Sequence, residues 1–511
     1  MLSQLVSAMI VSENTIYENV SGNLSTLANV YDAIVVGAGP GGATVASLLA
    51  NAGYRVLLVD KNSRAGGKMI TIRRDGHTYE MFPLNLIPYA PSLFERLAQT
   101  VGKAGKVRNV ATEFPADRVT MLYEDSESRI HALDTKNLSS FKSLQLGVSG
   151  TVRTMAALLR MLAMSSNTVK KYEKVSAFDY MNGLNIPEPV RVLITAAMGE
   201  GAFEMSSDMV PASHLIRALK MTLSRKHSTP RYYEGGVGGF FMTMVETVPE
   251  HGGTILWRTR VESIDIDDGR AVGITTKAGD KYLAPLVISN AGIRQTVVRL
   301  VGEQHFPRKY ADRIKNLQSN LADVGYRYFT TKNILDFSTY VYFPHDCLEP
   351  WQSFEDMRFG RKQPTSNYIY IGTKSVYPTI SPAGKQVIYA VMSCHPDPEQ
   401  DFSPYLAYVD SKVRMLFPEL FAAGVIEHQE IMGLKEVSAL GVDRIFEGQG
   451  GESYGIANSI GQSDGDRPTC DLPIPGLYCV GNDTEGFGVG THCAVDSGFR
   501  TFQKITESTT R

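Results

Sequence analysis

The sequence has few cysteines and lacks the spacings that bind structural metal ions. Its five cysteines are an odd number, no two form a C-x-x-C pair, and no His-Glu-x-x-His motif occurs. A disulfide framework or a structural zinc site is therefore not expected, and a reducing, cytoplasmic compartment is the simpler interpretation. The cysteines are Cys347, Cys394, Cys470, Cys479 and Cys493.

The chain also lacks long apolar runs and an excess of either charge. It has no apolar stretch of roughly 18 residues, so we expect no membrane-spanning helix. Residues 1–30 contain no Lys or Arg. A secretory signal begins with a basic region, so we interpret these residues as a leader outside the main fold. Basic residues number 51 and acidic residues 53, and this balance gives no support for nucleic-acid binding.

The apolar fraction of 43% over 511 residues is enough to bury the cores of two or three domains. The first strong pattern is a β-branched strand over residues 32–36, followed at once by a turn with four glycines. A helix-compatible stretch over residues 43–50 and a second strand over 55–59 come next, and Asp60 follows the strand. This succession predicts one βαβ unit of a parallel sheet.

The glycine turn has the spacing of a dinucleotide-binding fingerprint. Gly37 permits the tight turn, Gly39 lets a diphosphate approach the backbone, and Gly42 lets the helix pack on the strand. The helix N-terminus offers free N–H groups and a partial positive charge to phosphates. Asp60 is predicted to accept hydrogen bonds from ribose hydroxyls. The alternative is an ordinary βα turn, with Asp60 as a charged strand end.

Two further segments resemble the FAD motifs of the glutathione-reductase and amine-oxidase group. Gly66-Gly67-Lys68 resembles the extended motif in which a glycine pair precedes a basic residue, commonly Arg. The alternative is a glycine-rich surface turn. Residues 475–483 resemble the second motif, where a strand ends on glycine and a polar residue approaches the ribityl chain. Residues 488–498 resemble the segment beneath the flavin that opens the last helix, whose N-terminus stabilises an anionic reduced ring.

The succession of glycine and strand motifs between these ends is similar to the phytoene desaturase, carotenoid isomerase and retinol saturase family. It comprises residues 233–239, 251–255, 260–264 and 286–291, and the resemblance covers about residues 31–505. It implies that the backbone of Val261 clamps the adenine. The residues expected to bind FAD are Gly37, Gly39, Pro40, Gly41, Gly42, Asp60, Lys61, Gly66, Gly67, Lys68, Val261, Asn290, Ala291, Gly481, Asn482, Asp483, Val489, Gly490 and Thr491.

We therefore expect an α/β protein with a Rossmann-like FAD-binding domain and a discontinuous α+β substrate domain. The FAD-binding domain is expected from residues 31–90, 225–300 and 470–511. The substrate domain is expected from residues 91–224 and 301–469, with a mainly antiparallel sheet built from the tyrosine-rich alternating segments at 321–345 and 366–393.

The resemblance implies hydride transfer between a substrate carbon and flavin N5. Desaturation, saturation or isomerisation of an apolar isoprenoid or carotenoid-like substrate is the leading version. The resemblance also implies that the substrate enters from a membrane surface, which the protein would contact peripherally. Where the desaturases usually have a Gly/Pro-rich turn, this chain has Thr491-His492-Cys493. His492 and Glu485 are candidates for moving the second proton. The alternatives are a helix-start histidine bonded to backbone and a solvated carboxylate.

Two other functions stay open at this point. One is an amine-oxidase-like or cyclic-substrate dehydrogenase that acts on a soluble small molecule. The other is a non-catalytic prenyl-binding escort protein, against which the intact glycine motifs argue. A separate pattern over residues 152–164 predicts an amphipathic helix. For this helix a core-facing position is favoured over a membrane surface or a substrate tunnel.

Overall fold

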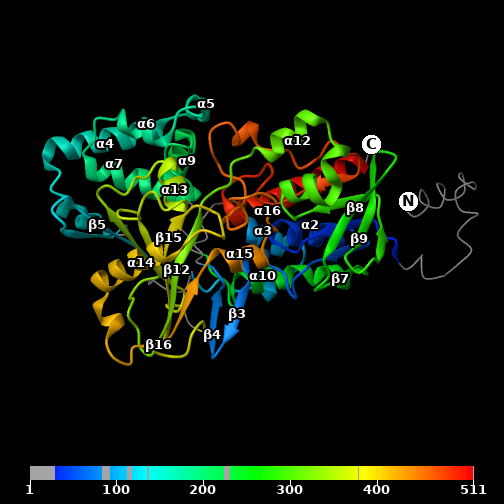
Figure 1. The fold of residues 1–511 in the computed structure, drawn as a ribbon, viewed down its shortest axis with the longest axis horizontal. Helices are drawn as coiled ribbons and strands as arrows, with labels where there is room; N and C mark the ends of the chain where they lie inside the picture. The colour runs from blue at the N-terminus through cyan, green and yellow to red at the C-terminus, as the bar shows by residue number, and fades with distance from the viewer. Residues whose placement is uncertain are drawn as a thin grey trace, which may run out of the picture.

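The computed structural model describes residues 29–82, 92–111, 118–134, 137–223, 231–377 and 379–509. The expected leader, residues 1–30, lies outside the described residues except for its last two. Of these, Val30 forms a parallel bridge with Leu283. Figure 1 shows two neighbouring bodies of strands and helices, with the strands at the centre of each.

A five-stranded parallel sheet forms the first body. Its strands run in the order β17 (Leu477–Cys479), β11 (Leu286–Ser289), β1 (Ala33–Val36), β2 (Val56–Val59) and β7 (Thr254–Leu256). All four residues of β1 and of β2 are buried, as the β-branched and leucine-rich runs predict for central parallel strands. Strands far apart in the sequence thus become neighbours, and the predicted Rossmann-like fold is confirmed.

Helices cover this sheet. Helix α2 (Pro40–Asn51) follows β1 and packs against α10 (Gly236–Val245) and the last helix, α16 (Gly490–Thr509). In Figure 1, α2 is blue and α16 is red, and the two lie side by side. The contact is close because Gly498 has no side chain: a Cβ there would lie 2.7 Å from the Thr44 side chain. A three-stranded antiparallel sheet of β8 (Val261–Asp267), β9 (Arg270–Thr276) and β10 (Lys281–Leu283) adjoins this layer.

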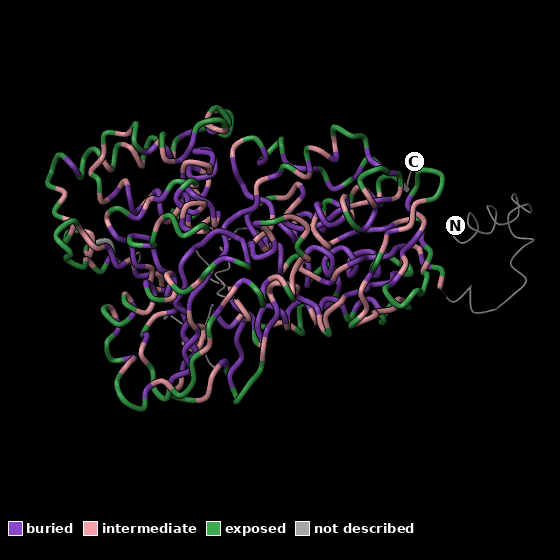
Figure 2. Tube along the Cα trace, in the orientation of Figure 1, coloured by how far each residue is buried: buried purple, intermediate pink, exposed green. Residues whose placement is uncertain are grey.

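A seven-stranded sheet forms the second body. Its order is β16 (Ile426–Met432), β12 (Ala322–Thr330), β15 (Gln386–Cys394), β14 (Ile369–Thr373), β13 (Thr339–Pro344), β5 (Val119–Glu124) and β6 (Ile130–Asp134). Neighbouring strands are antiparallel except β13 and β5, which pair in parallel. The predicted mainly antiparallel sheet is confirmed. In Figure 2 the buried, purple segments follow the strands and the green segments lie at the rim.

The remaining elements connect or cover the two sheets. A hairpin of β3 (Thr71–Arg74) and β4 (His77–Glu80) lies against α10. The other helices are α3 (Leu93–Thr100), α4 (Gly147–Ala163), α5 (Ser166–Lys170), α6 (Ala177–Asn182), α7 (Glu188–Ile194), α8 (Gly201–Phe203), α9 (Ala212–Thr222), α11 (Thr247–Glu250), α12 (Arg308–Lys315), α13 (Trp351–Arg358), α14 (Ser403–Leu416) and α15 (Leu434–Leu440). Short 3-10 or π segments occupy Gly67–Met69, Ala104–Lys106, Leu138–Leu144, Thr195–Glu200, Gln295–Gly302, Glu303–His305, Pro418–Phe421 and Asp464–Asp466. Across the described ranges, no helix combines the length and apolarity needed to cross a bilayer.

Candidate functional site

A single cavity joins the carboxyl ends of the parallel strands to the second body. It holds about 1490 Å³ of space between protein atoms, its open mouth included. Gly39, after β1, and Asp483, after β17, both line it, although they lie far apart in the sequence. Residues 440–443 and 452–456 line it from the other side. The carboxyl edge of an open parallel sheet is where dinucleotides bind in such folds.

The glycine turn at this edge has the close contacts that its fingerprint predicts. Gly37 has a φ of +98°, in the left-handed region. A Cβ at Gly42 would lie 1.9 Å from the Gly37 carbonyl oxygen, so only glycine lets α2 start here. Helix α2 begins at Pro40 without a side-chain cap. Pro40 has no N–H group, so the N–H groups that this helix end offers to an anion are those of Gly41 and Gly42.

The carboxylate of Asp60 supports the glycine turn. Asp60 is 6% exposed, and its two oxygens accept hydrogen bonds from the backbone N–H groups of Ala38 at 2.6 Å and Asn62 at 2.7 Å. Burial raises the pKa of Asp60, and these two bonds oppose that shift. The residue lines the cavity. The predicted contact with ribose hydroxyls would therefore use the lone pairs that the backbone leaves open.

The opposite wall is tied together by two polar side chains. The amide nitrogen of Asn290 donates to the Val480 carbonyl at 2.7 Å and so links the ends of β11 and β17. The carboxylate of Asp483 accepts from the backbone N–H groups of Ile293 at 3.0 Å and Ile456 at 2.9 Å. Three segments from different parts of the chain are thus fixed at one edge of the cavity.

A buried arginine that the sequence analysis did not single out holds the same wall from behind. Arg467 is 6% exposed, and its guanidinium donates to the carbonyls of Asn482 at 3.0 Å, Thr484 at 3.3 Å, Ala457 at 3.3 Å and Ile456 at 3.2 Å. It also donates to the Asn458 side chain. Residues 456–458 and 482–484 are therefore held together by one side chain. Arg467 lies outside every motif, which is why no sequence pattern pointed to it.

The cavity contains buried polar atoms whose hydrogen bonds are incomplete. Arg294 is 7% exposed and donates from Nη1 to Ser319 at 2.8 Å, but its Nε and Nη2 have no partner among the described residues. The side-chain oxygen and nitrogen of Asn482 also have no hydrogen-bond partner among the described residues. Lys68 donates to the Glu452 carbonyl. Burial lowers the pKa of Lys68 and that of Arg294. Because buried polar groups are normally satisfied, these atoms fit a polar, anionic ligand such as FAD.

The mouth of the cavity is crossed by the segment after α15. Asp443 forms ion pairs with Lys61 at 2.8 Å, with Arg299 at 3.2 Å and with Arg260. The Asn62 side chain donates to the Leu440 carbonyl at 3.0 Å. The segment therefore attaches the second body to the β2 end of the parallel sheet, beside Asp60.

Most of the predicted cofactor residues line this cavity, and four do not. The lining residues are Gly37, Gly39, Pro40, Asp60, Lys61, Gly67, Lys68, Val261, Asn290, Ala291, Gly481, Asn482, Asp483, Gly490 and Thr491. The exceptions are Gly41, Gly42, Gly66 and Val489. Gly41 and Gly42 serve close backbone packing against Gly481 and Gly37, and Gly66 takes a φ of +117°. Their own contact with a cofactor stays a prediction.

The two candidates for moving a proton are not among the residues that line the cavity. His492 is buried, its Nδ1 lies 3.1 Å from the Phe487 carbonyl, and burial lowers its pKa to about 4. Glu485 accepts hydrogen bonds from Lys504 at 2.7 Å and from the Cys470 N–H at 3.2 Å. The histidine geometry matches its alternative, a backbone-bonded histidine, whereas Glu485 is ion-paired and is not the solvated carboxylate of its alternative. A role of either residue in moving a proton stays a prediction.

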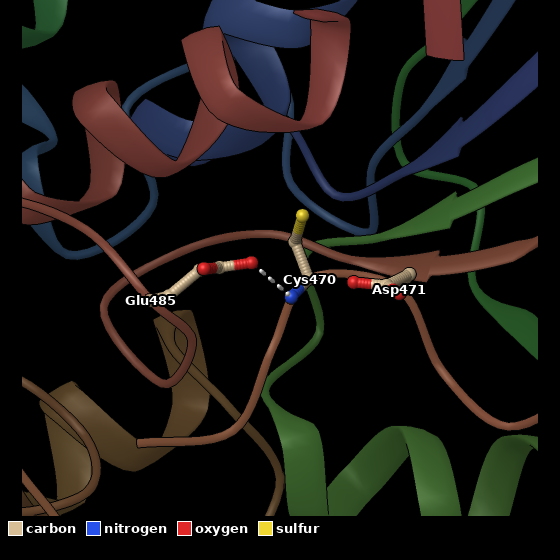
Figure 3. Close-up of side chains that lie close together, drawn as sticks. All are labelled: Cys470, Asp471 and Glu485. Carbon is tan, nitrogen blue, oxygen red and sulfur yellow. Dashed lines mark hydrogen bonds between the residues drawn. The ribbon is translucent and has the colours of Figure 1, made fainter. Parts of the chain in front are cut away.

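Figure 3 shows the one group of described side chains with metal-ligand spacing, Cys470, Asp471 and Glu485. The ammonium of Lys504 binds both carboxylates, with Nζ 2.7 Å from Glu485 and in hydrogen-bond contact with Asp471. Burial also raises the pKa of the Cys470 thiol, which disfavours a thiolate ligand. A positive charge therefore already occupies the position that a metal ion would take.

Comparisons with known proteins agree with this geometry. Residues 41–506 match the family described as flavin containing amine oxidoreductase. The chain is 28% identical to 4,4'-diapolycopene oxygenase of Methylomonas sp over 56% of its length and 59% of that protein's. It is 24% identical to the chloroplastic prolycopene isomerase of Arabidopsis thaliana over 60% of its length and 56% of that protein's. The matches thus span less than two thirds of these relatives.

A solved structure of an oxidoreductase from Methanosarcina mazei superposes with a TM-score of 0.65 at 16% identity. The match covers 92% of this chain and 99% of that one, which shows a common fold. The family match begins at Gly41, within the glycine turn, and ends at residue 506 in α16, so it includes every cavity-lining segment that follows the turn. The chain therefore belongs to the family of flavin containing amine oxidoreductases, and its cofactor is FAD.

Proposed function

We propose that this protein moves a hydride between a carbon of an apolar isoprenoid or carotenoid-like substrate and N5 of FAD. Desaturation of a C–C bond is the leading version: the hydride of one carbon reduces N5, and the proton of the adjacent carbon is released to solvent. Saturation and isomerisation are variants of the same chemistry. The observation that carries the proposal is the cavity that joins Gly39 to Asp483, lined by segments of both bodies. The names of the relatives, a diapolycopene oxygenase and prolycopene isomerases, support the substrate class.

In this proposal FAD supplies the redox chemistry, and the chain's residues bind and orient it. The N-terminus of α2 and the guanidinium of Arg294 provide N–H donors and positive charge for its diphosphate. Asp60 and Asp483 accept from hydroxyls with the lone pairs that their backbone partners leave open. Helix α16 begins at Gly490 in the cavity wall, and its N-terminal end stabilises negative charge that develops there.

We further propose that residues 31–90, 225–300 and 470–511 form the FAD-binding domain and that residues 91–224 and 301–469 form the substrate domain. The assignment of strands supports this division. All strands of the five-stranded sheet fall in the first set, and all strands of the seven-stranded sheet fall in the second. The substrate would then meet the cofactor where residues 440–456 face the glycine turn, with the apolar molecule delivered from a membrane surface.

The test is anaerobic mixing of the holoprotein with a detergent-solubilised polyene. The expected result is loss of the oxidised flavin absorbance, together with a product that has one double bond more. Gly42→Val is the matched control, because a Cβ there lies 1.9 Å from the Gly37 carbonyl and a larger side chain disrupts the turn. That variant should carry no flavin and change no polyene.

Other outcomes of the same experiment decide between the open alternatives. A change in polyene geometry without net oxidation would identify an isomerase, since the relatives include prolycopene isomerases. Bleaching by a soluble amine or a cyclic ketone, with no response to polyenes, would refute the isoprenoid substrate. A purified protein that stays colourless after addition of FAD would refute the enzymatic reading altogether.

A further inference from the structure

Helix α4 presents a row of apolar side chains to solvent. Val148, Val152, Met155 and Leu159 are 84%, 61%, 50% and 59% exposed, although each is a large hydrophobic residue. Their spacing of four, three and four residues places them on one face of the helix. We call these four residues the α4 stripe. A contiguous exposed apolar row on a folded protein marks an interaction site.

The stripe is a second face of the helix and is separate from the one that packs on the protein. Met161 is 1% exposed and belongs to an apolar cluster with residues of α9, and Leu158 packs against the same cluster. The sequence analysis favoured a core-facing helix over residues 152–164. The structure agrees with this interpretation for the face that contains Met161, and it shows in addition a second apolar face that is exposed.

The segment that contains the stripe is rich in exposed positive charge. Between residues 138 and 175 the chain has six basic residues and one acidic residue, in a protein whose net charge is −2. The acidic residue, Glu173, is paired with Arg217 at 3.3 Å. Figure 1 shows α4 at the far end of the second body, with α5 on the same outer rim. The exposed basic residues are Lys142, Arg153, Arg160, Lys170, Lys171 and Lys174.

We propose that the α4 stripe is a docking surface for an anionic lipid bilayer. An amphipathic helix with Val, Met and Leu on one face and Lys and Arg beside it binds in the plane of such a surface. A second copy of the chain fits less well, because a twofold contact through the stripe would bring two sets of these basic residues together. The proposal rests on the proposed function, in which the apolar molecule is delivered from a membrane surface, and it names the surface that docks; docking itself is measurable without turnover.

The position of α4 connects such a surface with the functional site. The apolar cluster beneath α4 contains Met161 and Leu215 and continues to Ala457 and Val489, and Tyr454 packs against it. Tyr454 also lines the cavity, and Val489 precedes the cavity-lining Gly490. Packed apolar side chains thus lead from the docking helix to the wall of the cavity, which suits an apolar substrate drawn from the bilayer.

The test is cosedimentation of the full-length holoprotein with phosphatidylcholine vesicles, with and without phosphatidylglycerol. Wild type should bind the anionic vesicles and lose most of that binding in high salt. Val152→Asp together with Leu159→Asp should weaken binding at least about tenfold, because burial of these side chains is lost. The matched control is Ile431→Asp, since Ile431 on β16 is as exposed as Leu159, at 59%. It should bind like wild type.

Flavin content and detergent-based polyene turnover are measured on each variant. They should not change, which separates a failure of docking from a failure of the proposed reaction or of folding. Absence of wild-type binding to anionic vesicles would overturn the proposal. It would also be overturned if the aspartate variants dissociated a wild-type dimer in sedimentation velocity without changing vesicle binding. That outcome would assign the stripe to a second copy of the chain.

Discussion

The guanidinium of Arg467 offers the sharpest test of how the cavity wall is held. Replacing it in Arg467→Met keeps an apolar stem of similar length and removes every hydrogen bond to residues 456–458 and 482–484. These segments carry Asp483 and Ile456 in the wall of the cavity. The carbonyl oxygens that accepted from Arg467 would be left buried without a donor.

The magnitude follows from the number and kind of these bonds. A hydrogen bond from a charged donor contributes about 1.5–3 kcal/mol, and loss of a side chain that makes several such bonds costs about 3–5 kcal/mol in total, because each buried carbonyl left without a donor itself costs about 1–3 kcal/mol. We expect this total, since the several bonds share one side chain and do not add. For a cooperative unit of about 250 residues this corresponds to a fall of roughly 6–10 °C in the unfolding temperature.

The assay is the temperature at which flavin fluorescence appears as the holoprotein is heated. Arg467→Lys, which keeps the charge but has fewer fixed donors, should fall between wild type and Arg467→Met. The control is Arg500→Met, because Arg500 is 47% exposed and pairs with Asp496 within one helix. Its loss should have an effect of less than about 1 kcal/mol. Equal flavin-release temperatures for Arg467→Met and wild type would refute the reasoning.

Three further predictions concern the mouth of the cavity and the two residues outside it. Asp443→Asn should speed FAD dissociation and reduce its dependence on salt, measured by stopped-flow fluorescence, because the pairs with Lys61 and two arginines are lost. His492→Asn should leave the pH dependence of flavin reduction between about pH 6 and 9 unchanged, since burial lowers the His492 pKa to about 4; a lost titration step would contradict this. Burial alone would raise the pKa of Glu485, but the hydrogen bond from Lys504 holds that pKa below its usual value. The pair therefore stabilises the fold at neutral pH, and this stabilisation is lost as the pH falls through the folded pKa. Lys504→Met should therefore lower the unfolding temperature at pH 7 and progressively less as the pH falls below the usual glutamate pKa of about 4.3, and an equal loss at neutral and at strongly acidic pH would contradict the assignment.

The parts of the site that sequence analysis predicts are those whose chemistry is local. Gly37 has a positive φ, and a Cβ at Gly42 would lie within 2 Å of a neighbouring carbonyl oxygen. Such positions require glycine, so they appear in the sequence as glycines at a fixed spacing. The buried strands before these turns can also be predicted from the sequence, because a central parallel strand is apolar on both faces. Fold, cofactor and family follow from such segments.

The parts that escape prediction depend on partners brought together by the fold. Arg467 is defined by carbonyls on both sides of it, and Asp443 by cations more than a hundred residues away. No spacing encodes these contacts. The same limit applies to His492 and Glu485, because their contacts with the Phe487 carbonyl and with Lys504 form only in the fold, and neither residue is among those that line the cavity. The outward face of α4 was missed because periodicity reveals an apolar stripe and not what covers it.

The order of the parallel sheet has a consequence for synthesis of the protein in the cell. Strand β17 and residues 481–483 complete the sheet edge beside β11, yet every strand of the seven-stranded sheet precedes them in the sequence. A nascent chain therefore exposes the glycine turn with one wall missing while the second body is being made. Full enclosure of FAD has to wait until residue 483 has emerged, and until then the open chain is a form on which chaperones and proteases act.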